Sequence, residues 1–136
     1  MAKVKMTVDL EAAPDDVWNL IGGFNALPDW HPAVEKSELE EEGQTRKLSL
    51  AGGGTIIEKL IKKSDQERLY SYSIENSPLP VSDYTATICV KEEDGKTQVE
   101  WSSEFNPMGV PENDAVDVIK GIYQAGFDNL NKLFGK

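Results

Sequence analysis

The chain has 136 residues, of which 39% are hydrophobic and 28% are charged, and its formal net charge is −10 at pH 7. This length and composition predict a single soluble globular domain, long enough to bury a hydrophobic core. Such an acidic chain repels phosphate, so we expect neither a nucleic-acid partner nor binding to an anionic membrane surface.

Cysteine usage and the first residues bear on the cellular compartment. Cys89 is the only cysteine, which excludes an intramolecular disulfide and a cysteine-based metal site. A single thiol fits a reducing compartment. The stretch MAKVKMTVDL lacks the continuous apolar run of a signal peptide, and no segment has the length and apolarity of a membrane span. We therefore expect a cytoplasmic protein without a membrane span.

The first two predicted elements are a strand and a short helix. Apolar residues alternate with polar ones over residues 3–10, which is typical of a half-buried strand. Pro14 then begins a helix, with Asp15 and Asp16 in the first turn, where the helix dipole favours acidic side chains. The pair Gly22-Gly23 ends this helix.

About six antiparallel strands follow, separated by turn residues. Their expected ranges are 34–39, 46–50, 55–63, 68–74, 84–91 and 98–105. Turns are expected at Glu42–Gln44, at Gly52–Gly54 and at Ser64–Gln66, and Asp94-Gly95 is a hairpin signal. Residues Ser77–Pro80 form a longer connection, because neither of its prolines can donate to a β-ladder.

From about Glu112 the hydrophobic period becomes that of a helix, which we expect to continue to the C-terminus. Its apolar stripe consists of Val116, Ile119, Tyr123, Phe127, Leu130 and Phe134. Gly121 and Gly126 each weaken such a helix by about 1 kcal/mol relative to alanine. They indicate either that a neighbour approaches the helix backbone closely or that space is left beside the helix, and the sequence leaves both readings open.

This order of elements predicts an α+β fold in one domain over residues 1–136. A strongly curved antiparallel sheet of about seven strands would wrap around the long C-terminal helix, with short helices between the first and second strands. Side chains need not fill the wedge between a twisted sheet and a single helix, so the arrangement predicts an internal cavity.

Three segments carry a family resemblance: APDDVWNLIGGFNALPDWHPAV (13–34), GTIIEKLIKKSDQERLYSYSIENSPLPVSDYTATICV (54–90) and VEWSSEFNP (99–107). Together with the terminal helix they resemble the START-like (SRPBCC) superfamily, which has the helix-grip or Bet v 1-like fold. The resemblance is to the bacterial polyketide cyclase/dehydrase-like proteins and, more distantly, to the plant abscisic acid receptors. It covers nearly the whole chain, and its diffuse motifs are more specific for fold than for function.

The resemblance implies a deep apolar cavity between sheet and helix. Most members bind lipids, hormones or polyketides, and a minority catalyse cyclisation. His31 falls where the plant receptors have a lysine that meets a ligand carboxylate, and Glu58 matches one of their cavity glutamates. Residues 50–54 and 77–82 occupy the places of the two entrance loops. The receptors' Ser-Gly-Leu-Pro gate and His-Arg-Leu latch are not present, so signalling through a phosphatase partner is not implied.

Residues expected to line the cavity come from several elements. They are Trp30, His31, Leu48, Leu50, Glu58, Tyr70, Tyr72, Ile74, Leu79, Tyr84, Ala86, Ile88, Trp101, Ser103, Phe105, Ile119, Tyr123 and Phe127.

Alternative readings exist for the polar members of this set. His31, the only histidine, either faces the cavity with Glu58 or is held by backbone groups in a tight turn. Glu58 is either an inward carboxylate, with its pKa raised by burial, or a surface residue. The hydroxyl groups of Tyr70, Tyr72 and Tyr84 either need a ligand or water as partner or reach the rim of the sheet.

The leading hypothesis is a carrier or sensor that binds a hydrophobic small molecule, as a monomer or weak homodimer. The alternative is a cyclase, dehydratase or isomerase acting on a polyketide-like carbonyl compound, with His31 and Glu58 as candidate catalytic acid and base. A third class is an interaction module with an incidental cavity. We expect no cofactor or metal, because one histidine supplies too few ligands and Gly52–Gly54 is not followed by the lysine and helix of a phosphate-binding loop.

Overall fold

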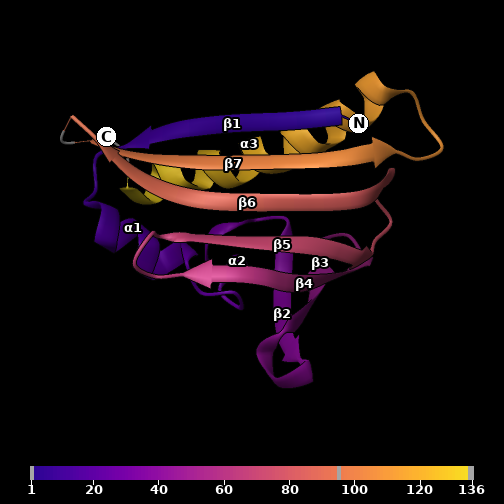
Figure 1. Ribbon diagram of the computed structural model, residues 1–136, viewed down its shortest axis with the longest axis horizontal. Helices are drawn as coiled ribbons and strands as arrows, with labels where there is room; N and C mark the ends of the chain where they lie inside the picture. Colours follow the sequence, from indigo (N-terminus) through magenta and orange to yellow (C-terminus); the bar gives the residue numbers. More distant parts are fainter. Residues whose placement is uncertain (1, 95, 135–136) are drawn as a thin grey trace.

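The computed structural model describes residues 2–94 and 96–134, over which a seven-stranded antiparallel sheet lies against one long helix (Figure 1). The elements are β1 (Ala2–Leu10), α1 (Pro14–Ile21), α2 (Leu27–Trp30), β2 (Val34–Glu40), the 3-10 helix η1 (Glu41–Gly43), β3 (Thr45–Leu50), β4 (Thr55–Ser64), β5 (Leu69–Asn76), β6 (Val81–Glu93), β7 (Lys96–Pro107) and α3 (Glu112–Phe134). The strand order is β1-β7-β6-β5-β4-β3-β2. Strands β2 to β6 therefore each pair with the next strand in the sequence, and β1 pairs with β7.

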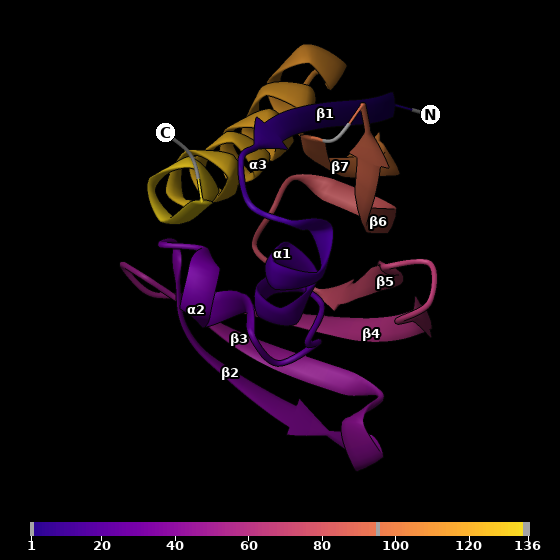
Figure 2. The same cartoon turned by 90° about the vertical axis from the view of Figure 1, so that its left-hand side faces the viewer.

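Seen end-on, the sheet curves from β1 and β7 round to β3 and β2, and the helices lie on its inner side (Figure 2). Helix α3 is tied to the rest of the fold at several points. The Glu11 amide donates to the Phe134 carbonyl at 3.2 Å, and Asn129 Nδ2 donates to the Trp30 carbonyl at 2.8 Å. These contacts confirm the predicted helix-grip arrangement, with short helices between the first and second strands.

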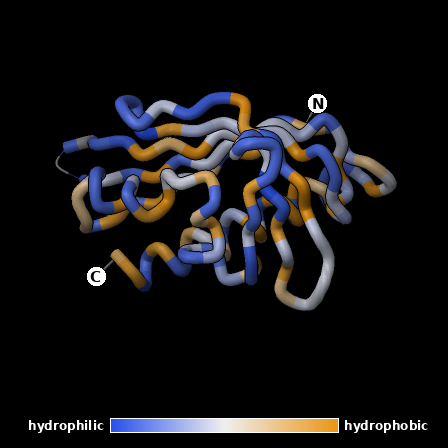
Figure 3. The backbone as a smooth tube through the Cα atoms, turned by 90° about the horizontal axis from the view of Figure 1, so that it is seen from below, coloured by the Kyte–Doolittle hydropathy of each residue, from blue (hydrophilic) through white to orange (hydrophobic). Residues whose placement is uncertain are grey.

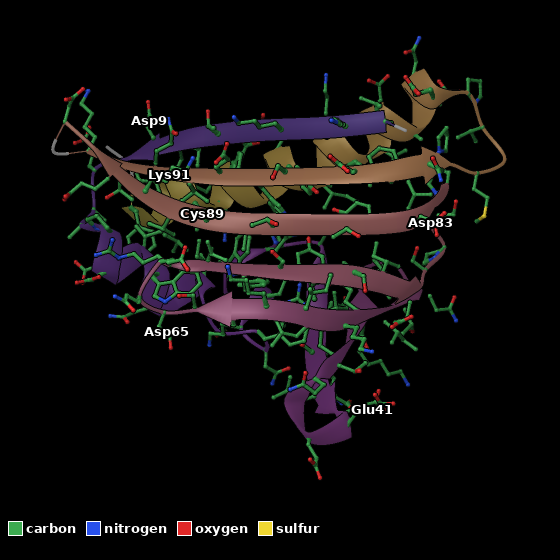
Figure 4. The ribbon with its side chains drawn as sticks, viewed as in Figure 1. Asp9, Glu41, Asp65, Asp83, Cys89 and Lys91 are labelled. Atoms are coloured by element: carbon green, nitrogen blue, oxygen red, sulfur yellow. The ribbon has the colours of Figure 1, made fainter. Side chains whose placement is uncertain are left out.

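Polar and apolar residues alternate along the strands, which separates the two faces of the sheet (Figure 3). In β7 the buried residues include Val99, Trp101 and Phe105. Cys89 and Lys91 of β6 lie on the face turned away from α3 (Figure 4). Within the described residues, none of the helices has the length and apolarity needed to cross a membrane.

Strand β4 contains two register shifts, one between Ile57 and Glu58 and the other between Leu60 and Lys62. Such bulges bend a strand and increase its local twist. These bulges also explain why the alternation of apolar residues in β4 does not show, from the sequence alone, which residues face inward. In the structure Ile56 and Glu58 are both buried.

The boundaries differ from the predicted ones mainly at strand ends. Strand β6 begins at Val81 and continues through a register shift between Ser82 and Thr85, which the apolar alternation alone does not detect. The predicted hairpin joins β6 to β7, since Glu93 pairs with Lys96. Gly95 itself lies outside the described residues, as do residues 135–136 at the predicted helix end.

The two glycines of α3 have different surroundings. A Cβ atom on Gly126 would lie 2.9 Å from both Trp30 Cζ3 and His31 Cδ2, whereas a Cβ atom on Gly121 would meet nothing within 4 Å. Gly126 therefore allows α3 to approach the Trp30–His31 pair closely. Of the two readings left open by the sequence, close approach holds for Gly126 and open space for Gly121.

Candidate ligand-binding site

A cavity of about 230 Å³ lies between the inner face of the sheet, the segment that follows α2 and helix α3. The sequence-predicted residues that line it are His31, Leu48, Leu50, Glu58, Tyr72, Ile74, Leu79, Tyr84, Trp101, Ile119 and Tyr123. The lining also includes Leu27, Ala33, Val34, Ala51, Ile56, Val118 and Ile122. The wall is therefore mostly aliphatic and aromatic, with a small number of polar groups.

The remaining residues expected at the wall are buried elsewhere in the core. They are Trp30, Tyr70, Ala86, Ile88, Ser103, Phe105 and Phe127. Aromatic rings fill this part of the space between sheet and helix: Trp30 and Trp101 lie 5.4 Å apart, and Trp101 and Phe127 lie 6.2 Å apart, between ring centroids. The cavity thus occupies only part of the wedge that the sequence predicts.

Both ring nitrogens of His31 are engaged by backbone groups. The Ala33 amide donates to Nδ1 at 3.1 Å, and Nε2 lies 2.7 Å from the Ile122 carbonyl. Because Nδ1 accepts a hydrogen bond, the proton must be on Nε2, which donates to Ile122. Burial lowers the pKa of His31 below its ordinary value of 6.5, although the bond to Ile122 opposes this. His31 is thus a neutral imidazole that connects the segment after α2 to α3.

Glu58 has a charged partner that the sequence interpretation missed. Arg46 lies opposite Glu58 in the register of β3 and β4. Arg46 Nε donates to Glu58 Oε1 at 2.8 Å, and Nη2 lies 2.6 Å from the same oxygen. Both residues are buried, at 0% and 5% exposure. Burial raises the pKa of Glu58, and the interaction with Arg46 opposes the rise. Of the two readings of Glu58, the inward carboxylate is therefore correct, and it is one half of a buried ion pair.

Arg46 is held on several sides. Its Nη1 donates to the Phe24 carbonyl at 2.6 Å and to the Tyr70 hydroxyl at 3.4 Å. Its guanidinium carbon lies 4.3 Å from the ring centroid of Phe24 and 5.1 Å from that of Tyr72, within cation–π range. Arg46 thereby joins the segment between α1 and α2 to the sheet. Arg46 and Leu48 are two residues apart on β3 and so share a face of the strand, and this spacing is the sequence signal that could have placed Arg46 on the inner face.

The tyrosine hydroxyls find partners inside the protein. Trp101 Nε1 donates to the Tyr72 hydroxyl at 3.0 Å, and the hydroxyls of Tyr84 and Tyr123 hydrogen bond with each other. Trp101 also stacks on Tyr123, with 4.1 Å between ring centroids. Burial raises the pKa values of Tyr72, Tyr84 and Tyr123 above the ordinary value of 10.0. These phenols are therefore neutral hydrogen-bonding groups at the wall.

The two predicted entrance loops lie next to each other beside the cavity. Leu50 and Ala51 from one loop and Leu79 from the other belong to its lining. A Cβ atom on Gly54 would lie 3.8 Å from Pro78 Cγ, so the two loops are close together at this point. The three glycines Gly52–Gly54 all have positive φ, between 86° and 103°, a conformation that favours glycine.

A curved antiparallel sheet, a long C-terminal helix packed in its concavity and a mostly apolar cavity between them define a START-like (SRPBCC) protein with the helix-grip fold. The chain belongs to the family described as "Polyketide cyclase / dehydrase and lipid transport", which matches residues 1–135.

Solved structures include similar proteins over almost the whole chain. The protein XoxI from Bacillus cereus is 43% identical, with a TM-score of 0.96, covering 98% of this chain and 96% of XoxI. An uncharacterized protein from Bacillus thuringiensis is 42% identical, with a TM-score of 0.95, covering 99% and 100% of the respective chains. The ZhuI aromatase/cyclase from Streptomyces sp. R1128 shares the fold at 19% identity and a TM-score of 0.76, covering 95% and 90%. No curated protein matches the chain.

Proposed function

We propose that the protein binds a small apolar or amphipathic molecule in the cavity between sheet and helix, as a carrier or sensor. The observation that carries this proposal is the composition of the cavity wall, which is mostly aliphatic and aromatic with a few polar groups. Ligand sites in proteins have this composition. The family description, which includes lipid transport, supports the same conclusion. At about 230 Å³ the cavity suits a compact molecule, because common ligand pockets measure roughly 300–1,000 Å³.

Access to the cavity would be controlled by the adjoining loops at residues 50–54 and 77–82. Their proximity near Gly54 and Pro78 supports a role as a gate, since separating the loops would uncover Leu50 and Leu79 at the wall. Loops of this kind commonly open and close over ligands.

Binding without turnover is favoured over acid–base catalysis by the contacts of His31 and Glu58. The nitrogens of His31 already hydrogen bond with Ala33 and Ile122, so the imidazole has no free lone pair to accept a substrate proton. Glu58 is paired with Arg46, which opposes its protonation. Each candidate catalyst thus has a structural partner of its own.

We further propose that the protein is a cytoplasmic monomer and does not bind nucleic acid. The lone cysteine, Cys89, fits a reducing compartment. Edge strand β2 exposes Glu35, Lys36 and Glu38, and such charges discourage edge-to-edge pairing with a second sheet. The net charge of −10 opposes binding to a phosphate backbone.

The test is binding of naphthalene, a compact apolar probe, followed by proton–nitrogen NMR of the indole N–H signals. We expect naphthalene to shift the Trp101 signal in the wild type. Ile119 is buried at the cavity wall, so Ile119→Trp should fill the space and abolish the shift. Lys120→Trp adds the same ring at an exposed position of α3 and should leave binding unchanged. Equal binding by all three proteins would contradict the proposal.

A further inference from the structure

The carboxylate of Glu58 offers one oxygen to the cavity. Both hydrogen-bonding contacts from Arg46 are made to Oε1. Oε2 accepts no hydrogen bond from any residue that the structure describes, although Glu58 is buried and belongs to the cavity lining. The Glu58 side chain keeps 7% of its surface exposed and lines the cavity, so this oxygen is open to the cavity. This oxygen is therefore positioned to accept a hydrogen bond from a molecule in the cavity.

The hydroxyl group of Tyr72 offers a proton at the same part of the wall. Its oxygen accepts from Trp101 Nε1, and the indole can only donate, so the hydroxyl hydrogen remains available. Over residues 2–94 and 96–134 no side chain or backbone oxygen accepts that hydrogen. In the register of β4 and β5, Glu58 is opposite Ile74 and Tyr72 is the next inward residue. Such diagonal neighbours lie roughly 7–8 Å apart along the sheet, and both residues line the same cavity.

The cavity holds no cation that could receive an anionic ligand. No lysine or arginine belongs to its described lining. The guanidinium of Arg46 is directed at Glu58, Phe24 and Tyr70. His31 is neutral, with its N–H donated to the Ile122 carbonyl. A ligand carboxylate would therefore face the carboxylate of Glu58 without compensation, which is costly in a buried site.

On the basis of the proposed function, we infer that the ligand is an uncharged apolar alcohol or phenol whose hydroxyl group donates to Oε2 of Glu58 and accepts from the hydroxyl group of Tyr72. A single hydroxyl group meets both requirements, because it is a donor and an acceptor at once. This differs from the role that the family resemblance implies for position 31, where a lysine in the plant receptors meets a ligand carboxylate.

The experiment compares four bicyclic probes of similar shape: naphthalene, 2-naphthol, 2-methoxynaphthalene and 2-naphthoate. Affinities are measured by NMR titration of the Trp101 indole signal. We expect 2-naphthol to bind roughly ten-fold or more tightly than 2-methoxynaphthalene, which accepts but cannot donate, because the hydrogen bond is made to a charged oxygen. We expect 2-naphthoate to bind more weakly than naphthalene.

Glu58→Gln tests the role of the carboxylate. Arg46 needs an acceptor, so the amide oxygen should take the place of Oε1 and the amide NH₂ should face the cavity. The preference for 2-naphthol over 2-methoxynaphthalene should then disappear. Glu75→Gln, the same change at an exposed position of neighbouring β5, should leave the preference intact. If Glu58→Gln does not fold, the double variant Arg46→Met/Glu58→Met removes both buried charges and should bind the two probes equally.

The outcomes separate this inference from the proposed function. If naphthalene binds the wild type but 2-naphthol binds no more tightly than 2-methoxynaphthalene, the inference is wrong and the proposed function stands. The same holds if 2-naphthoate binds the most tightly of the four probes. If none of the four probes binds, the proposed function fails as well. Retention of the ten-fold preference in the double variant would also overturn the inference.

Discussion

Arg46 and Glu58 lie directly opposite each other on β3 and β4, and their side chains form a buried ion pair with 2.6 Å between Nη2 and Oε1. The guanidinium also bonds the Phe24 carbonyl, so the pair connects the sheet to the segment between the first two helices. A charge of this kind is tolerated in a core only while its partner is present.

Removing one member of this ion pair should therefore lower the stability of the fold much more than removing both. We expect Glu58→Met alone to lower the free energy of unfolding by about 3–5 kcal/mol, because it leaves Arg46 buried without a counter-charge. Arg46→Met/Glu58→Met should recover most of this loss. Urea unfolding followed by circular dichroism measures both effects. Lys3→Met, which breaks an ion pair with Glu104 exposed at 75% and 56%, should change stability by less than about 1 kcal/mol. A double variant as unstable as the single one would contradict this account.

The two glycines of α3 should respond in opposite directions to the same substitution. Gly126→Ala places a Cβ atom 2.9 Å from Trp30 and His31, so we expect a loss of about 1–3 kcal/mol from overpacking, despite the better helix propensity of alanine. Gly121→Ala meets nothing within 4 Å and should gain up to about 1 kcal/mol. Thermal denaturation of the two variants provides the comparison, and stabilisation by Gly126→Ala would show that the aromatic pair moves aside easily.

His31 should make the protein less stable in mildly acidic solution. Its folded-state pKa is below the ordinary value of 6.5 because the ring is buried. Above pH 6.5 the ring is neutral in both states; as the pH falls below 6.5, the unfolded chain binds a proton first, so stability declines towards the lower folded pKa. The slope from this group is at most about 1.4 kcal/mol per pH unit, since one proton is involved.

Comparison with His31→Gln isolates this effect, because the chain has only one histidine. Glu58 contributes with the opposite sign, since its pKa is raised above 4.5 and protonation favours the folded state there, but it is present in both proteins. Denaturant midpoints measured between pH 5 and 8 should converge or cross for the two proteins as the pH falls. Parallel pH profiles would mean that the imidazole titrates normally in the folded protein.

Alkaline titration should reveal the raised pKa values of the buried phenols Tyr72, Tyr84 and Tyr123. Burial raises the pKa values of Tyr72, Tyr84 and Tyr123 above 10.0, so the folded protein retains protons that the unfolded chain loses. The stabilisation that these protonated phenols contribute is fully present below pH 10, and it is lost as the pH rises through their higher folded-state pKa values. Phenolate absorbance should therefore appear for these residues together with unfolding, and Tyr84→Phe should remove one phenol from that late step. Ionisation of Tyr72, Tyr84 and Tyr123 near pH 10 with the fold retained would argue against the buried network.

The fold and much of the cavity could be predicted because they depend on periodicity. Alternation along the strands and the helical stripe containing Ile119 and Tyr123 assign inner faces without knowledge of pairing. Val118 and Ile122 were missed because they lie beside the predicted apolar stripe of the helix. This side of the helix lines the cavity. Ile56 could have been found from the resemblance, because Glu58 matches a cavity glutamate and Ile56, two residues before it, lies on the same face of β4.

The polar chemistry of the site could not be predicted in the same way. The partnership of Arg46 with Glu58 depends on the register of two strands, which their sequences alone do not determine. His31 contacts Ala33 nearby in the sequence, but its other partner, Ile122, is 91 residues away. The sequence around a histidine in a short connection does not indicate which carbonyl the imidazole will contact, because that carbonyl belongs to a distant helix.

The strand order has a consequence for how the protein acquires its structure. Strands β2 to β7 can pair successively as each emerges, but β1 pairs only with β7, with Ala2 opposite Phe105. Closing such a long segment of chain carries an entropic cost before any contact is gained. During synthesis β1 must therefore stay unpaired, with Val4 and Leu10 uncovered, until β7 has been made. Strand β1 thus joins the sheet only after the hairpin of β6 and β7 exists, although it precedes every other strand in the sequence.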